Sequence, residues 1–234
     1  MTPYPRYAIY YVPAATDPLY RLGAEALGYD SFSGSAIDFP KAITESVSDW
    51  VEVTTDPRKY GFHATLKAPF ALAPGRSEAE LLKAVEAFAA PATPTIPLVV
   101  SAISSFIAVI PAAPSAELSA LAQTCVEAFD GFRAPLTERD RARRRPDRLT
   151  ERQLTYLDRW GYPYVADEFR FHMTLTGSLP RDRHDHLLPI LRSLFRDITA
   201  TPRAIDRIAL CRQADAAARF RTIAERELTA RAGR

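Results

Sequence analysis

The sequence predicts an α/β fold of the α+β type, built as two similar lobes that face each other across one cleft. The segment Phe-His-Ala-Thr-Leu at 62–66 recurs as Phe-His-Met-Thr-Leu at 171–175. After each copy the same order of predicted elements follows, a helix and then two strands. An internal duplication explains both observations. We therefore expect residues 1–234 to form one bilobed domain with one copy of the segment in each lobe.

The first quarter of the chain begins with a predicted strand. Residues 7–12 are rich in aromatic and β-branched side chains, and Pro13 ends the run. Leucines and alanines between 17 and 27 have the spacing of a short helix. Glycine, serine and proline interrupt any period between 28 and 56, so we expect a loop there, with a short helix near 40–46.

The middle of the chain alternates helices and strands after the first copy of the repeated segment. Ser77 and Glu80 have the spacing of a capping box, and an apolar stripe follows them, so a helix is expected there. Two apolar runs at 96–102 and 106–110 predict a hairpin. A second amphipathic helix is predicted to begin at Ser115.

The last third of the chain repeats this plan around the second copy. Apolar residues within 154–160 predict a helix before it, and a leucine stripe at 187–194 predicts another after it. Pro189 should kink this helix or start a new one. Alternation at 205–210 predicts a strand, and 220–224 could form a last one.

Composition sets limits on the class of protein. Of 234 residues, 47% are hydrophobic and 25% are charged, as in an ordinary globular protein, and the net charge of +2 neither requires nor excludes nucleic acid. Cys125 and Cys211 form no zinc or disulfide pattern, which favours a reducing compartment. No signal peptide or membrane-spanning run is evident, so we expect a cytoplasmic protein without a membrane partner.

The repeated segment carries the candidate chemistry. Side chains alternate between the two faces of a strand, so each copy should present polar residues on one face and apolar residues on the other. The polar residues are His63, Thr65 and Lys67 in the first copy and Arg170, His172 and Thr174 in the second. We expect these two polar faces to meet across the cleft.

Two histidines across a cleft can act as one general base and one general acid. Threonine hydroxyls two residues further on can donate hydrogen bonds to an oxyanion, and a nearby lysine or arginine can add positive charge. The substrate that best matches this set is a phosphodiester. One imidazole would deprotonate water, and the other would protonate the departing oxygen.

His63-Ala64-Thr65-Leu66 and His172-Met173-Thr174-Leu175 resemble the paired H-x-[ST]-hydrophobic motifs of the 2H phosphoesterase superfamily. The wider context, at 60–70 and 160–165, is similar to a branch of that superfamily associated with bacterial phosphonate metabolism. The resemblance implies an antiparallel sheet in each lobe and chemistry without a metal or other cofactor. It also implies catalytic roles for both histidines and both threonines. The resemblance does not settle the substrate: a sugar cyclic phosphate is one hypothesis, and nucleoside or RNA-terminal cyclic phosphates are open alternatives.

Five further residues are candidates for substrate binding, and each has a plain structural alternative. Tyr162 and Tyr164 could stack on a base or bind a phosphate, but they could equally pack the interface between lobes. Lys67 could face the cleft or be a solvated strand lysine. The same ambiguity holds for Tyr60 and Arg170.

The segment 139–148 is strongly basic, and either a solvated helix face or a phosphate-facing lid explains it. His184 and His186 diverge on a helix and lack a third ligand, so no metal site is predicted. The leading function is a hydrolase that opens a small cyclic phosphodiester. The alternative is an RNA-binding or RNA-end-processing protein that acts on 2′,3′-cyclic phosphate termini. A metal-dependent phosphatase is a third alternative, and the oligomeric state is not predicted.

Overall fold

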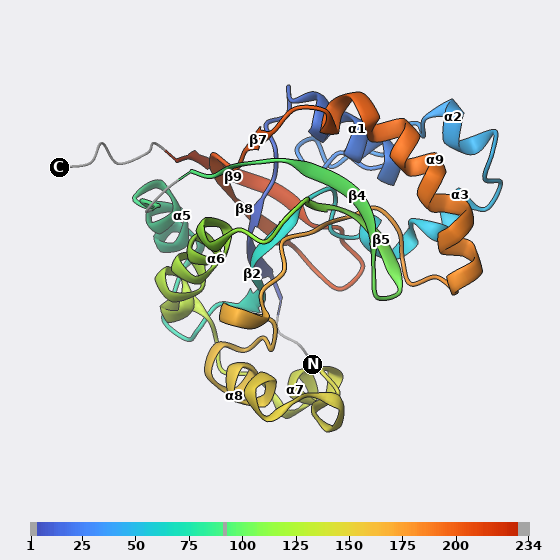
Figure 1. Cartoon of the computed structure of the whole chain (residues 1–234). Helices are drawn as coiled ribbons and strands as arrows, with labels where there is room; N and C mark the ends of the chain where they lie inside the picture. Colours follow the sequence, from blue (N-terminus) through green and yellow to red (C-terminus); the bar gives the residue numbers. More distant parts are fainter. Residues whose placement is uncertain (1–3, 91–92, 229–234) are drawn as a thin grey trace.

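The computed structural model describes residues 4–90 and 93–228, and within these ranges its centre is one antiparallel sheet of seven strands (Figure 1). A second, two-stranded sheet pairs β3 (Thr95–Ile96) with β7 (Arg203–Ala204). The order across the large sheet is β4 (Leu98–Ile103), β5 (Phe106–Pro111), β6 (Met173–Thr174), β2 (Ala64–Ala71), β1 (Arg6–Tyr11), β8 (Arg207–Gln213) and β9 (Arg221–Glu227).

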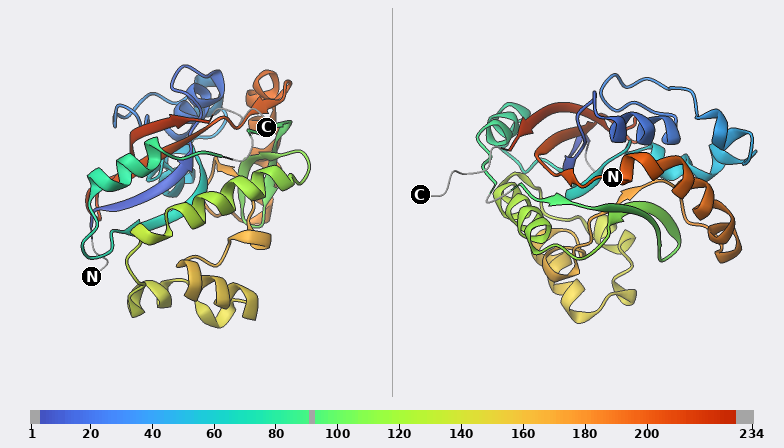
Figure 2. Two further views of the ribbon diagram at one scale, coloured as in Figure 1. Left: turned by 90° about the vertical axis from the view of Figure 1, so that its left-hand side faces the viewer. Right: turned by 45° about the horizontal axis from the view of Figure 1, so that its top comes forward.

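The longer helices pack on different parts of this sheet. Helix α6 (Ala116–Ala128) lies on β2, α5 (Glu78–Glu86) on β8 and β9, and α9 (Arg181–Thr199) on β4 and β5. Helix α1 (Pro18–Leu27) packs beside α9. Helices α7 (Glu138–Arg143) and α8 (Glu151–Trp160) form an arm that projects away from the sheet in both views, here called the α7–α8 arm (Figures 1 and 2).

Close packing beneath the first histidine explains a glycine inside α1. A Cβ atom at Gly23 would lie 2.3 Å from the ring of Phe62, and that ring in turn stacks on Phe195 of α9. Glycine within a helix costs about 1 kcal/mol relative to alanine. Here its absent side chain lets the fully buried Phe62 ring sit against the helix, directly before His63.

The prediction of mixed helices and antiparallel strands is confirmed. After each repeated segment a helix and then the predicted pair of strands follow, with an additional two-residue strand, β3 or β7, before the pair. The prediction of a separate sheet in each lobe is not confirmed. The hairpin β4–β5 follows the first segment in sequence, but its strand β5 pairs with β6 of the second segment. The hairpin β8–β9 follows the second segment, but its strand β8 pairs with β1, which pairs with β2 of the first segment. A single bridge between Ala64 and Met173 then joins both sets of strands into one sheet.

Two local predictions need correction. Between residues 28 and 56 the structure has α2 (Lys41–Thr44), as predicted, but also α3 (Trp50–Val53), and α4 (Thr55–Arg58) follows directly. Helices of four residues are too short to show a hydrophobic period. Helix α9 is continuous through Pro189, so no new helix begins there, because its buried apolar face extends on both sides of the proline. No helix within the described ranges is long and apolar enough to cross a bilayer.

Candidate functional site

The two repeated segments lie side by side where β2 meets β6. Ala64 and Met173 pair in antiparallel register, and each histidine immediately precedes its strand. Residues directly opposite one another in such a pair share a face of the sheet. Extending the register by one residue in each direction opposes His63 with Thr174 and Thr65 with His172. Each histidine therefore lies across from the threonine of the other segment.

The ring of His63 is fixed by three neighbours. Its Nδ1 lies 2.8 Å from the carbonyl oxygen of Gly61, its Nε2 lies 3.3 Å from Oγ1 of Thr65, and the Tyr10 ring stacks on it at 3.8 Å. A carbonyl can only accept, so Nδ1 carries the proton of this hydrogen bond. In the neutral ring, Nε2 is then left with its lone pair.

The ring of His172 is held in the same way. Its Nδ1 donates to the carbonyl oxygen of Arg170 at 2.7 Å. Arg170 is two residues earlier in the chain, just as Gly61 is two residues before His63. The ring of Phe106 lies 5.5 Å away. Both histidines therefore have the tautomer in which Nε2 is free to accept a proton or, once protonated, to donate one.

Burial keeps both imidazoles neutral near pH 7. Desolvation lowers the pKa of His63 to about 4, against the opposing effect of its bond to Gly61. The nearby charge of His172 lowers this pKa further, so the two rings lie close enough to interact. Desolvation also lowers the pKa of His172, and its bond to Arg170 opposes this shift.

This lowered pKa predicts a loss of stability in mild acid. Between pH 6.5 and about 4 the unfolded chain binds a proton at His63 that the folded chain does not, so stability falls as the pH falls through this window. The side chain is partly exposed, so we expect a contribution of about 2 kcal/mol. Denaturant unfolding at pH 7 and at pH 4.5 measures the fall in the free energy of unfolding between the two pH values. In His63→Gln this fall should be smaller than in the unmodified chain by about 2 kcal/mol. An unchanged drop would contradict the prediction.

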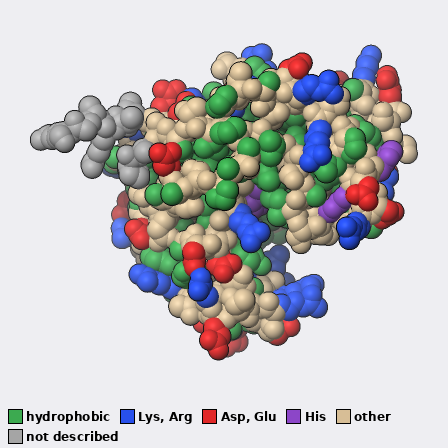
Figure 3. All heavy atoms as spheres, viewed as in Figure 1, with side chains coloured by type: hydrophobic (Ala, Val, Ile, Leu, Met, Phe, Trp, Pro, Cys, Tyr) green, Lys and Arg blue, Asp and Glu red, His purple; other side chains and the backbone are tan. Residues whose placement is uncertain are grey.

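A cavity of about 400 Å³, here called the histidine cavity, opens beside the second segment. Thr65 and His172 line it, whereas His63 is not part of the lining but contacts Thr65 through Nε2 at 3.3 Å. Figure 3 shows a hollow between the α7–α8 arm and the body of the molecule, with basic and histidine side chains above it. Polar and aromatic residues of the lining include Thr65, Phe106, Gln153, Tyr162, Tyr164, Glu168, Arg170 and His172.

Four of the five predicted substrate-binding residues lie near the two histidines. Tyr162, Tyr164 and Arg170 line the histidine cavity. Tyr60 lines a neighbouring cavity, and its ring centre is 6.1 Å from that of His63. Substrate binding by these residues remains a prediction.

Lys67 is the exception, because it does not share a face with Thr65. Tyr10 pairs with Thr65 and Ile9 with Lys67, so Leu66 is an extra residue that forms a bulge in β2. Side chains of the adjacent residues Ile9 and Tyr10 point to opposite faces, and those of their partners must do the same. The prediction that Lys67 faces the cleft is therefore wrong.

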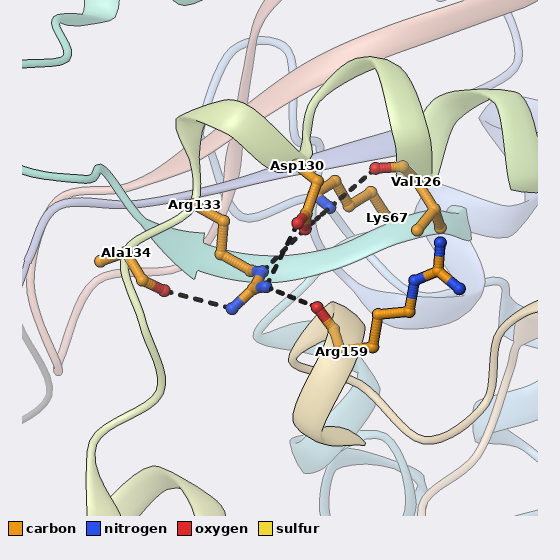
Figure 4. A network of polar contacts seen from close by, with 6 residues as sticks. All are labelled: Lys67, Val126, Asp130, Arg133, Ala134 and Arg159. Carbon is orange, nitrogen blue, oxygen red and sulfur yellow. Dashed lines mark hydrogen bonds and ion pairs between the residues drawn. The ribbon is translucent and has the colours of Figure 1, made fainter. Parts of the chain in front are cut away.

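Lys67 instead joins a buried polar network (Figure 4). Its ammonium donates to the carbonyl of Val126 at 3.0 Å and to Asp130 at 2.9 Å. Burial lowers the pKa of Lys67, and the bonds to Asp130 oppose this shift. Burial alone would raise the pKa of Asp130, but hydrogen bonds from Arg133 and Lys67 outweigh it and hold that pKa below its ordinary value. Arg133 also donates to the carbonyl of Arg159, which ties the α7–α8 arm to the sheet.

The arginines of the basic segment 139–148 have different surroundings. Arg141 pairs with Asp158 on the surface of the arm. Arg143 and Arg144 instead line the cavity that contains Tyr60. The segment is thus partly a solvated helix face and partly the wall of a cavity.

Sequence reasoning missed several residues of the site. Tyr10 belongs to a correctly predicted strand, but nothing in its sequence context indicated that it would stack on His63. Phe106, Gln153 and Glu168 reach the histidine cavity from three different elements. In the part of the chain that the structure describes, no group of three histidine, cysteine, aspartate or glutamate residues could hold a metal ion.

Two curated relatives are similar to nearly the whole chain. One, from Janthinobacterium sp. (strain Marseille), is 36% identical over 220 residues, which are 89% of this chain and 47% of that protein. The other, from Laribacter hongkongensis (strain HLHK9), is 31% identical over 217 residues, which are 92% of this chain and 50% of that protein. Both are named ribose 1,5-bisphosphate phosphokinase PhnN. The chain spans about half the length of the curated relatives it matches.

These names contradict the predicted hydrolysis of a cyclic phosphodiester. A phosphokinase transfers a phosphoryl group and is not a hydrolase, so the expectation of a cyclic phosphodiesterase is wrong, and the RNA-end-processing alternative is dropped with it. The physical reason lies in the motif itself. A histidine pair specifies how protons move at a phosphate group, but not which oxygen receives the phosphoryl group.

A protein-family model also matches the chain. It covers residues 65–221, from the first threonine of the site to the first residue of the last strand, and so includes the whole second segment. Its description reads "Protein of unknown function (DUF1045)" and names no activity. The match extends over more than half of the sequence, and the chain therefore belongs to the DUF1045 family.

Proposed function

We propose that this chain binds a phosphorylated ribose compound in the histidine cavity, and that His63 and His172 move protons during phosphoryl transfer to a hydroxyl group. The observation that carries the proposal is the register of β2 and β6, which opposes each histidine with the threonine of the other segment. The resemblance of the paired H-x-T segments to the 2H superfamily supports this assignment of the site. So does the position of the β2–β6 bridge, because one histidine directly precedes each of the two strands.

The tautomers of the two rings suit this role. Because each Nδ1 is engaged by a carbonyl, each Nε2 is the atom that exchanges protons. One Nε2 accepts the proton of the attacking hydroxyl as the new oxygen–phosphorus bond forms. The other becomes protonated when the bound phosphate raises its pKa, and it gives this proton to the oxygen that leaves phosphorus. Thr65 and Thr174 donate hydrogen bonds to the non-bridging oxygens.

The lining of the histidine cavity suits a sugar. Glu168 accepts a hydrogen bond from Gln153 at 3.0 Å, and its remaining acceptor capacity can receive sugar hydroxyls. Arg170 can pair with a phosphate, and the tyrosine rings offer flat apolar surfaces. The relatives named for a ribose bisphosphate indicate the same class of ligand.

The four histidines of the chain allow a test with an internal control. We expect ribose 5-phosphate to shift the Cε1–H proton resonances of His63 and His172 and to raise their pKa values. The resonances of His184 and His186 on α9 should not move. Phosphorus NMR of ribose 1,5-bisphosphate with a nucleoside triphosphate should then reveal transfer. Equal shifts at all four histidines, or none, would overturn the proposal.

A further inference from the structure

A second cavity, of about 210 Å³, lies next to the histidine cavity and is lined by arginines. It is bounded by the linker that precedes α7, by α7 and by β1 and β2. Asp140 is the carboxylate in its lining. The side chains used here are Arg6, Arg133, Arg143, Arg144, Tyr60 and Tyr162, and the cavity is called the arginine pocket.

One arginine is already held in place. Arg6 donates from Nε to Oε1 of Gln213 at 2.9 Å and also from Nη2, and its guanidinium lies 5.6 Å from the centre of the Phe220 ring. Glutamine is neutral, so these bonds orient the guanidinium without cancelling its charge. An oriented guanidinium binds a phosphate with little further loss of side-chain freedom.

The charge of the pocket is only partly balanced. Arg133 is paired with Asp130 at 2.8 Å. The lining holds four arginines, Arg6, Arg133, Arg143 and Arg144, and Asp140 is the carboxylate among them. Arg144 lies 4.9 Å from the centre of the Tyr162 ring. Arginines grouped in a cavity in this way favour an anion with several oxygen acceptors.

Two tyrosines connect the arginine pocket with the histidines. Tyr162 lines both cavities, so they share a wall. Tyr60 lines the arginine pocket, and its ring centre is 6.1 Å from that of His63. The two cavities are therefore adjacent, on either side of the Tyr162 ring.

We propose that the arginine pocket binds a second phosphate of the ligand whose first phosphate lies at the histidine pair. The ligand is then a ribose that carries two phosphates, and the pocket selects it over a monophosphate. This inference rests on the proposed function, because it presupposes that a phosphorylated ribose occupies the histidine cavity. It adds the residues that distinguish one phosphorylated ribose from another.

The test compares two ligands and three variants by calorimetry. We expect ribose 1,5-bisphosphate to bind at least about tenfold more tightly than ribose 5-phosphate, because its second phosphate makes charge-assisted hydrogen bonds that the monophosphate lacks. Arg144→Gln should remove most of this gain and change the affinity for ribose 5-phosphate less than twofold. Arg143→Gln, at a more exposed position, should act in the same direction. Arg139→Gln, in the same basic segment but outside the pocket lining, is the matched control and should change neither affinity.

The outcomes separate this inference from the proposed function. If the bisphosphate has no advantage, or Arg144→Gln weakens both ligands equally, the second-phosphate site is wrong even when the resonances of His63 and His172 still respond. If ribose 5-phosphate leaves those resonances unchanged, the proposed function fails first. A selective loss of bisphosphate affinity, together with intact histidine shifts, supports both.

Discussion

Replacing either histidine of the site by asparagine should lower phosphoryl transfer by about a thousandfold, the middle of the range for general acid–base catalysis. The asparagine amide can still donate to the carbonyl that now accepts from Nδ1, of Gly61 for His63 and of Arg170 for His172. Only the function of Nε2 is removed. Turnover measured by phosphorus NMR gives the loss, and the free energy of unfolding shows whether each variant remains folded.

The exposed His186 on α9 supplies the matched control, and His186→Asn should leave turnover unchanged. The double variant of both site histidines should lose little more than either single variant, because groups that act in one step are not additive. If His63→Asn or His172→Asn keeps turnover within tenfold of the unmodified chain, acid–base catalysis by this pair is refuted.

The sequence was sufficient to predict that His63 and Thr65 share a face, because alternation holds over these three residues. The contact of 3.3 Å between Nε2 of His63 and Oγ1 of Thr65 shows that the two side chains lie on the same face. Two residues further along the strand the same rule failed at Lys67. One inserted residue in β2 reverses the faces, and a bulge depends on how the neighbouring strand pairs. No pattern within β2 itself encodes that pairing.

The strands of the sheet were predictable from local sequence, but the pairing between them was not. Each helix, strand, strand unit was predictable from its own residues. Which hairpin joins which repeated segment was not, because β4–β5 pairs with a strand that lies far along the chain. The structure therefore has one large sheet that contains both repeated segments, where the sequence had predicted two separate sheets. Composition also could not predict which arginines of 139–148 lie in a cavity. Arg144 lies over the Tyr162 ring, whereas Arg141 pairs with Asp158 on the surface, because contacts with distant residues decide these positions.

The largest expected effect on stability comes from Asp130, the shared acceptor of the buried network (Figure 4). Asp130→Asn should lower the free energy of unfolding by about 3 kcal/mol, because removing one partner of a buried ion pair leaves an uncompensated charge. The Lys67 side chain is only 3% exposed, so its ammonium cannot turn to water. Denaturant unfolding at pH 7 measures the loss.

Two further variants identify the cause of that loss. Asp158→Asn removes a surface partner of Arg141, with both side chains more than 40% exposed, and should change the free energy of unfolding far less than Asp130→Asn does. Adding Lys67→Met to Asp130→Asn should recover part of the stability, because it removes the unpaired ammonium while keeping an unbranched side chain. A loss at Asp130 no larger than that at Asp158 would mean that the network contributes little. Since Arg133 bonds both Asp130 and the end of α8, the expected loss would also loosen the α7–α8 arm that forms one wall of the arginine pocket.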